Sequence, residues 1–114
     1  MIRIALLFSA FALVTALPLA AETINGILVD QACSADMSYD DAKGHSKECA
    51  MMDDCKKSGF GVVTADGKFL KFDAAGDKKA LEAIEASDKE EGIMISVDGT
   101  VDGKTIKVTS LKIT

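Results

Sequence analysis

From residue 23 onward, apolar residues form short runs that are separated by polar segments. The run TINGILVD, residues 23–30, is rich in aliphatic and β-branched side chains and predicts a first strand. Two further short apolar runs lie within residues 60–72, on either side of Asp66 and Gly67. Because an Asp-Gly dipeptide tolerates the positive φ of a tight turn, this region predicts a hairpin of two strands.

The C-terminal part of the chain repeats this arrangement. Residues 92–101 and 104–114 alternate apolar and polar positions around Asp102 and Gly103. Strict alternation is typical of a strand with one buried face, and the Asp-Gly dipeptide again indicates a hairpin. We therefore expect a fourth and a fifth strand here.

In the last of these strands, the apolar residues do not all fall on one face, as a regular two-residue alternation would require. Ile106 and Val108 share one face, whereas Leu111 and Ile113 would fall on the other. A bulge near residues 109–110 would reconcile the two halves, because it adds one residue to the strand.

Between the two hairpins the hydrophobic period changes. In residues 73–91, Ala80, Leu81 and Ile84 recur at helical spacing, and charged residues occupy the other positions. This pattern predicts a short amphipathic helix that ends by Gly92.

The expected order is strand, long insert, strand, strand, helix, strand, strand. It is the order of a small five-stranded Greek-key barrel of OB type, with the helix between strands three and four. We expect a mostly β (α+β) single domain over residues 22–114, with a generic α+β sandwich as the alternative. The insert spans residues 31–59 and lies between strands one and two, where OB folds commonly carry a binding loop.

Residues 1–21 have a different character. Arg3 is followed by an apolar run and then by small residues, which is typical of a secretory signal peptide. We expect cleavage before Glu22, release to the periplasm or secretion, and no stable membrane insertion afterwards. The competing interpretation is an uncleaved anchor, but no basic stop-transfer cluster follows the run.

Composition limits the partners. The chain has 13 Lys and Arg against 18 Asp and Glu, a net charge of −5 at pH 7, with no Trp and one Tyr. Nucleic-acid binding requires clustered cations, and stacking platforms require aromatic residues, so we expect no nucleic-acid partner. Cations, small ligands and envelope proteins remain open as partners.

The insert concentrates the residues that carry chemistry. Residues 41–57 favour helix, because they contain no Pro and only one Gly. On one helix, His45, Cys49 and Met52 would share a face, and Cys55 would lie at its edge. Function is therefore expected in this segment.

These residues predict a soft or borderline metal site. Thiolate and thioether ligands select cuprous copper, whereas thiolate with imidazole suits zinc. Neither the H-x3-C nor the C-x5-C spacing of this chain matches a standard zinc knuckle. The predicted metal ligands are Cys33, His45, Cys49 and Cys55, with Met52 as an additional ligand.

A disulfide-stapled insert is the alternative. Exported domains of this size tend to pair their cysteines, and Cys33 with either Cys49 or Cys55 fits better than Cys49 with Cys55. One thiol would then be left for metal binding, an intermolecular disulfide or redox chemistry. No Ser-His-Asp set, phosphate loop or CxxC motif is present, so we expect no enzyme, with thiol redox activity left open.

Several segments together resemble a group of small exported bacterial proteins that have no assigned activity. These segments are GILVDQAC, then His45, then ECAMMDDCKKSGFGVVTADGKFLKF, and finally VDGTVDGKTIKVTSLKIT. The resemblance covers nearly all of residues 22–114 and includes Asp30 and Gly59. It implies that the three cysteines and the histidine form one set.

The sequence thus predicts an exported OB-like binding module that holds copper or zinc in its Cys/His insert. The alternative is a metal-free, disulfide-stabilised module that binds a peptide, a glycan or an envelope protein.

Overall fold

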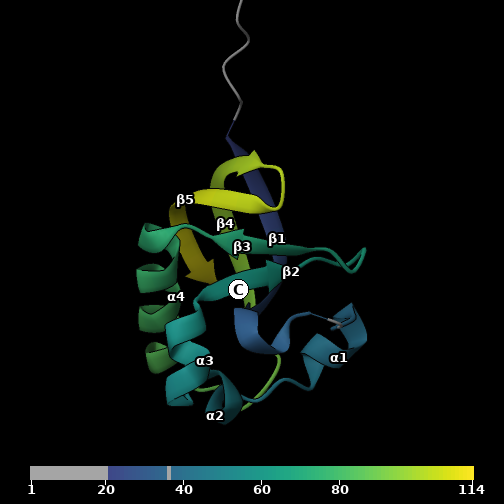
Figure 1. Cartoon of the computed structure of the whole chain (residues 1–114), viewed down its shortest axis with the longest axis vertical. Coiled ribbons are helices and arrows are strands. Elements are labelled where there is room, and N and C mark those ends of the chain that lie inside the picture. The colour runs from purple at the N-terminus through teal and green to yellow at the C-terminus, as the bar shows by residue number, and fades with distance from the viewer. Residues whose placement is uncertain (1–20, 36) are drawn as a thin grey trace, which may run out of the picture.

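The computed structural model describes residues 21–35 and 37–114, so the predicted signal peptide, residues 1–21, falls almost wholly outside the described residues. The described chain forms five strands, four α-helices and one short 3-10 helix (Figure 1). In chain order they are β1 Glu22–Asp30, η1 Gln31–Cys33, α1 Tyr39–Lys43, α2 Lys47–Ala50, α3 Asp53–Ser58, β2 Phe60–Val63, β3 Phe69–Phe72, α4 Ala74–Ala86, β4 Met94–Asp102 and β5 Thr105–Ile113.

The five predicted strands are confirmed, and they form one sheet that closes on itself. The strand order around the ring is β1-β2-β3-β5-β4, and β4 pairs back onto β1. Every pairing is antiparallel except that of β3 with β5, which is parallel. The β3–β5 contact is short, with Lys71 opposite Thr105 and Phe72 opposite Ile106, so the rest of β5 pairs with β4 alone.

The turn and bulge predictions are also confirmed. Gly67 and Gly103 have φ of 81° and 62°, values that favour glycine and complete the two hairpin turns. On the β4–β5 ladder, Asp98 pairs with Ser110 but Gly99 pairs with Val108. The residue between Val108 and Ser110 is therefore the extra one, at the predicted position.

Helix α4 fills the predicted place between β3 and β4, although it ends at Ala86 rather than at Gly92. Asp73 caps its first turn by accepting a hydrogen bond from the N–H of Gly76 at 3.0 Å. The same Asp73 oxygen accepts from the N–H of Val108 at 3.2 Å. One carboxylate thus fixes both the start of α4 and its position against β5.

Strand β1 is buried on both of its faces in its second half. Leu28 packs in the main core inside the ring, together with residues of β2, β3, β4, β5 and α4. Ile27 and Val29 point the other way and pack with Ala42 of α1 and Val63 of β2. The insert therefore covers the outside of the ring where β1 ends, as Figure 1 shows for α1.

Residues 41–57 are helical in part, as predicted, but a single helix that would place His45, Cys49 and Met52 on one face is not formed. The segment forms α1, α2 and α3, which Figure 1 shows gathered at one end of the sheet. Gly44 ends α1, and the Ser46 hydroxyl caps α2 by accepting from the N–H of Cys49 at 3.0 Å. A serine that caps a new helix competes with continuation of the old one, because its side chain satisfies the free N–H groups.

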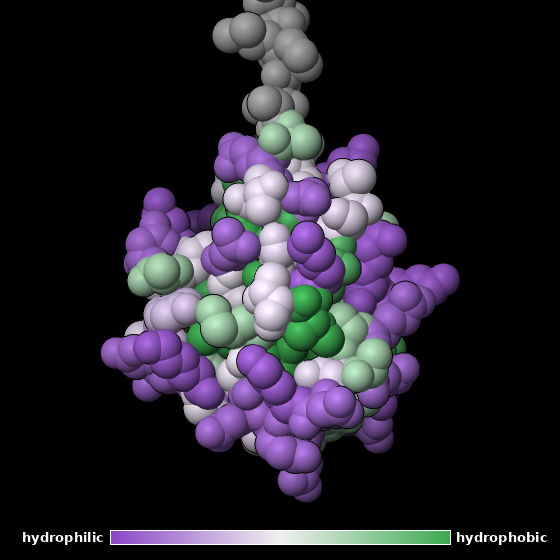
Figure 2. Space-filling view, turned by 180° about the vertical axis from the view of Figure 1, so that it is seen from behind, coloured by the Kyte–Doolittle hydropathy of each residue, from purple (hydrophilic) through white to green (hydrophobic). Residues whose placement is uncertain are grey.

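The face of the molecule that Figure 2 shows is mainly hydrophilic. On the face shown in Figure 2, polar side chains surround small apolar areas. The exposed large apolar residues of the described chain are Met52, Met94 and Ile113. None of the helices that the structure describes is long and apolar enough to cross a membrane.

Candidate metal centre

The centre of the site is Asp30, the last residue of β1. Its side chain is fully buried, which is rare for a carboxylate and requires partners. Asp30 Oδ2 accepts a hydrogen bond from the N–H of Cys33 at 3.1 Å and so caps the 3-10 turn of η1. The end of the strand and the start of the insert are thereby tied to one buried group.

His45 is the second partner of this carboxylate. Its Nε2 lies 2.7 Å from Asp30 Oδ1, and its side chain is 7% exposed. Because a carboxylate oxygen accepts, the imidazole Nε2–H is the donor in this contact. His45 is therefore occupied by Asp30 and does not share a helix face with Cys49 and Met52, as the single-helix interpretation required.

Backbone pairing with a distant loop holds His45 in place. The carbonyl of His45 accepts from the N–H of Gly92 at 3.1 Å, and the N–H of Lys47 donates to the carbonyl of Glu90 at 2.7 Å. Ser46 and Glu91 form an isolated antiparallel bridge between these contacts. The segment that carries the imidazole is thus anchored to the loop before β4.

Cys33 and Cys55 approach each other because η1 and α3 are joined by hydrogen bonds. The N–H of Gln31 donates to the carbonyl of Gly59 at 2.8 Å, and the N–H of Ala32 donates to the Ser58 hydroxyl at 3.0 Å. Gly59 has φ of 86°, where a side chain would be strained. Gly59 therefore allows the chain to turn at the end of α3, where its carbonyl pairs with Gln31, and this pairing brings α3 with Cys55 close to Cys33.

The hydrogen bonds described above bring three potential metal ligands close together. A carboxylate oxygen of Asp30 and the sulfurs of Cys33 and Cys55 all lie within 4.8 Å of one another. Asp30 is buried, Cys55 is half-buried and Cys33 is exposed, so the group is open to solvent on one side. Three separate elements, β1, η1 and α3, supply one donor each.

The surroundings of the two thiols favour their protonated forms. Partial burial, the hydrogen bond to Asp30 and the Asp30 charge together raise the pKa of Cys33 to about 11. Burial and the same charge also raise the pKa of Cys55. Because the thiolate is the nucleophile in thiol redox chemistry, raised pKa values argue against a redox-active pair at neutral pH.

The other two predicted ligands have exposed side chains. Cys49 lies on α2 and is not one of the donors that lie within 4.8 Å of one another. Met52, 58% exposed, precedes α3. All three cysteines lie in the described part of the chain and are free thiols, so the alternative disulfide is not formed here.

A scan of family models, a search of curated proteins and a search of solved structures each gave no match for this chain.

The donor group fits a borderline metal. Zinc binds Cys sulfur at about 2.3 Å and carboxylate oxygen at about 2.0–2.2 Å, so two donors of a tetrahedral ion lie about 3.5–3.8 Å apart. The donors here lie within 4.8 Å of one another, so the side chains would have to close by up to about 1 Å around the ion.

Sequence reasoning missed Asp30 as a member of this group. The available signal was its position, because it ends a buried strand and precedes Cys33 by three residues.

Proposed function

We propose that the protein binds a transition metal through Asp30, Cys33 and Cys55. The observation that carries the proposal is the donor group, two sulfurs and a carboxylate oxygen within 4.8 Å. His45 and the N–H of Cys33 hold the carboxylate from both of its oxygens. Such support is what orients the ligands of metal sites in proteins.

Zinc is favoured over copper. Cuprous copper selects thiolate and thioether ligands, and the side chain of Met52 is exposed. The third donor is instead the Asp30 carboxylate, a harder ligand that zinc accepts alongside thiolates. The ion would draw Cys33 and Cys55 in their thiolate forms, with their protons released to solvent.

The number of donors supports a reactive or exchangeable site. Structural zinc sites are closed by four protein ligands, whereas sites that act on a substrate or exchange their ion keep one position open. Three donors are present, and Cys33 is exposed to solvent. A water molecule, a small ligand or a donor from an envelope protein would complete the coordination.

We place this site in an exported OB-like module. The strand order β1-β2-β3-β5-β4, with α4 between β3 and β4, supports the OB-type Greek-key assignment. The leader predicted at residues 1–21 supports export to the periplasm. The resemblance to small exported bacterial proteins, which includes Asp30, Cys33 and Cys55, supports one shared site.

A second function follows from the proximity of two sulfurs. A disulfide-containing oxidant could exchange with Cys33 and Cys55, forming an S–S bond between them while the oxidant takes up the two electrons and two protons and leaves as a dithiol. This disulfide would join η1 to α3 and remove two of the three donors. The protein would then be a metal-free module that binds a peptide, a glycan or an envelope protein. An oxidising compartment favours this form.

Cobalt(II) titration of the reduced protein tests the proposal, because thiolate ligands give cobalt a charge-transfer absorption. We expect one equivalent to bind with this absorption. Cys33→Ser and Cys55→Ser should abolish or halve the absorption, and Asp30→Asn should weaken binding. Cys49→Ser and Met52→Leu are the matched controls and should bind as the parent does. Equal spectra for all five variants, or no binding by the reduced parent, would reject the site.

A further inference from the structure

A groove lies between α4 and the last residues of β5, two elements that Figure 1 shows side by side. Lys79, Glu82 and Ala83 line it from α4, and residues 110–113 line it from β5. Its volume is about 420 Å³, within the range of about 300–1,000 Å³ that is usual for ligand sites. The groove is separate from the metal centre, because none of the three metal donors lines it.

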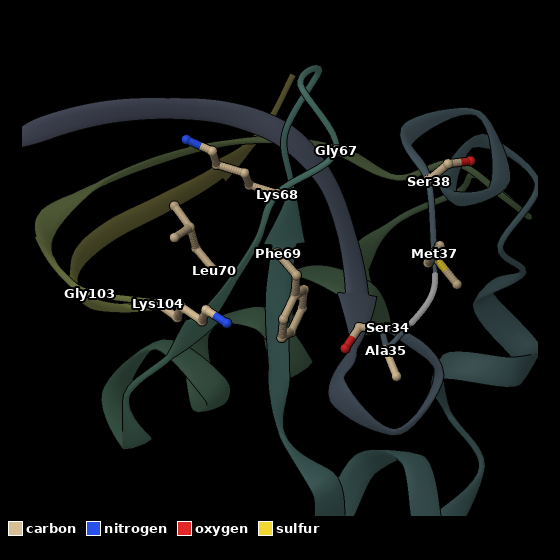
Figure 3. A pocket seen from close by; sticks show the side chains of 10 residues that line it. All are labelled: Ser34, Ala35, Met37, Ser38, Gly67, Lys68, Phe69, Leu70, Gly103 and Lys104. Atoms are coloured by element: carbon tan, nitrogen blue, oxygen red, sulfur yellow. The ribbon is translucent and has the colours of Figure 1, made fainter.

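One face of β5 gives the groove an apolar wall. Leu111 and Ile113 are two residues apart, so their side chains point to the same side of the strand. Leu111 is half-buried, and Ile113 is 36% exposed. In a larger hollow beside β3, by contrast, Phe69 and Leu70 point to opposite sides of their strand (Figure 3). The β5 groove therefore offers two neighbouring apolar side chains to one ligand.

The first half of β5 has partners along both of its edges. Strand β4 pairs along one edge, and β3 pairs with Thr105 and Ile106 along the other. Further along this second edge, the N–H of Val108 donates to Asp73 Oδ1 at 3.2 Å. This part of β5 is therefore closed to any additional strand.

The second half of β5 has a free edge. The N–H of Thr114 donates to the carbonyl of Met94 at 3.0 Å, so the backbone groups of Thr114 and of Lys112, two residues earlier, face β4. The backbone groups of Leu111 and Ile113 therefore face away from β4, and no described residue outside β4 makes a backbone hydrogen bond with them. Unpaired N–H and C=O groups in a row are a template for another strand.

The charge beside this edge is positive. Strand β5 contains two lysines and no carboxylate, and Lys112 takes part in none of the ion pairs among the described residues. On the neighbouring strand, the hydroxyls of Thr23 and Ser110 donate to the two oxygens of Asp98. These hydrogen bonds, and to a smaller degree the charge of Lys112, lower the pKa of Asp98. Lys112 therefore remains available to a carboxylate on an added strand.

We propose that the free edge of β5 binds an extended segment of a partner protein, which adds a strand to the sheet beside α4. The segment would alternate apolar and acidic residues. Its apolar side chains would lie in the groove against the apolar wall and Ala83, and its carboxylates would lie on the other face, beside Lys112. On α4, Lys79 and Glu82 lie one turn apart and offset each other, so Lys112 determines the charge that the partner must have.

A second copy of the chain fits this edge less well. Antiparallel pairing of two β5 edges through Leu111 and Ile113 would place Lys112 opposite its own counterpart, because Lys112 lies midway between them. Like charges directly opposite each other destabilise a strand pair. The charge of this edge therefore favours an acidic partner strand over self-association.

Fluorescence anisotropy with a labelled eight-residue peptide of alternating valine and glutamate tests this inference on the metal-free, reduced protein. We expect one peptide to bind, with amide NMR shifts concentrated at residues 79–83 and 110–113. A peptide with lysine in place of glutamate should bind about three- to tenfold more weakly. The valine/glutamate peptide that is N-methylated at every residue should not bind, because it lacks the N–H groups that pair with the edge.

A charge reversal on β5 separates this edge from the rest of the strand. Lys112→Glu should bind the valine/lysine peptide more tightly than the valine/glutamate peptide. Lys107→Glu makes the same change where β3 and Asp73 occupy the edge, and it should keep the preference of the parent.

The inference is overturned if the parent binds both peptides equally, if the N-methylated peptide binds as well as its parent peptide, or if the two variants behave alike. Sedimentation of the free protein tests the remaining occupant. A concentration-dependent dimer with NMR shifts at residues 110–113 would assign the edge to a second copy and would also overturn the inference.

Discussion

The Nε2 atom of His45 lies 2.7 Å from Oδ1 of Asp30, and both side chains are buried although 15 residues separate them. The other oxygen of the same carboxylate accepts from the N–H of Cys33. A buried carboxylate held from two directions keeps a fixed position beside the two thiols of the donor group. This relationship makes His45 a positioning residue in our account and Asp30 a ligand.

Replacing His45 should weaken the metal site without removing it. His45→Ala removes the donor to Asp30 Oδ1, and loss of such supporting contacts typically lowers metal affinity by about 10- to 100-fold. His45→Gln retains an N–H donor and should recover part of the affinity. Competition with a chromophoric chelator measures both variants, and circular dichroism checks that they fold. An unchanged affinity for His45→Ala would remove this residue from the site, whereas complete loss of bound metal would make it a ligand.

Metal binding should weaken steeply as the pH falls. The pKa of Cys33 is about 11 and that of Cys55 is raised, so both thiols are protonated at pH 7 and must lose their protons to bind an ion. We expect about two protons released per zinc ion bound, and an affinity that falls by up to about 100-fold for each pH unit of acidification. Calorimetry in buffers with different ionisation enthalpies counts the protons. Binding without proton release would contradict ligation by these thiols.

In the metal-free, reduced protein, Cys33 should alkylate slowly at neutral pH despite its exposure. Its raised pKa leaves little thiolate at pH 7, and the rate should rise about tenfold per pH unit until the pH approaches 11. Iodoacetamide labelling at several pH values, read by peptide mass spectrometry, gives this profile. A half-maximal rate near or below pH 8 would instead indicate an activated thiol and would support the redox alternative.

The Asp73 cap should contribute measurably to stability. Asp73→Ala removes acceptors for the N–H groups of Gly76 and Val108, and loss of an N-cap typically costs about 0.5–2 kcal/mol. Urea unfolding should show this decrease in the free energy of unfolding. Asp88→Ala, at an exposed carboxylate beyond the end of α4, is the control and should change stability by less than about 0.5 kcal/mol. Equal stability of the two variants would show that the cap is dispensable.

The strands and α4 could be predicted from the sequence because each is defined by local periodicity. Asp66-Gly67 and Asp102-Gly103 mark turns wherever strands flank them, and the change of face after Val108 requires an extra residue. These signals depend on neighbouring residues only, so tertiary structure did not override them.

The insert could not be predicted in the same way. Helix propensity favours one helix over residues 41–57, but Ser46 starts a new helix and the 45–47 segment pairs with the loop before β4. Cys33 and Cys55 were both named as ligands, yet their meeting depends on hydrogen bonds between η1 and α3. Asp30 was missed because a carboxylate at a strand end gains its role only through burial beside His45.

Native mass spectrometry of the protein, purified without added metal, shows whether an ion occupies the Asp30, Cys33 and Cys55 group. We expect a mass one zinc ion above that of the chain, loss of the ion on denaturation, and three reduced thiols. Cys33→Ser should lack the ion, whereas Cys49→Ser should retain it. A metal-free mass two hydrogens short, with Cys33 joined to Cys55, would show that these thiols form a disulfide and do not hold a metal ion.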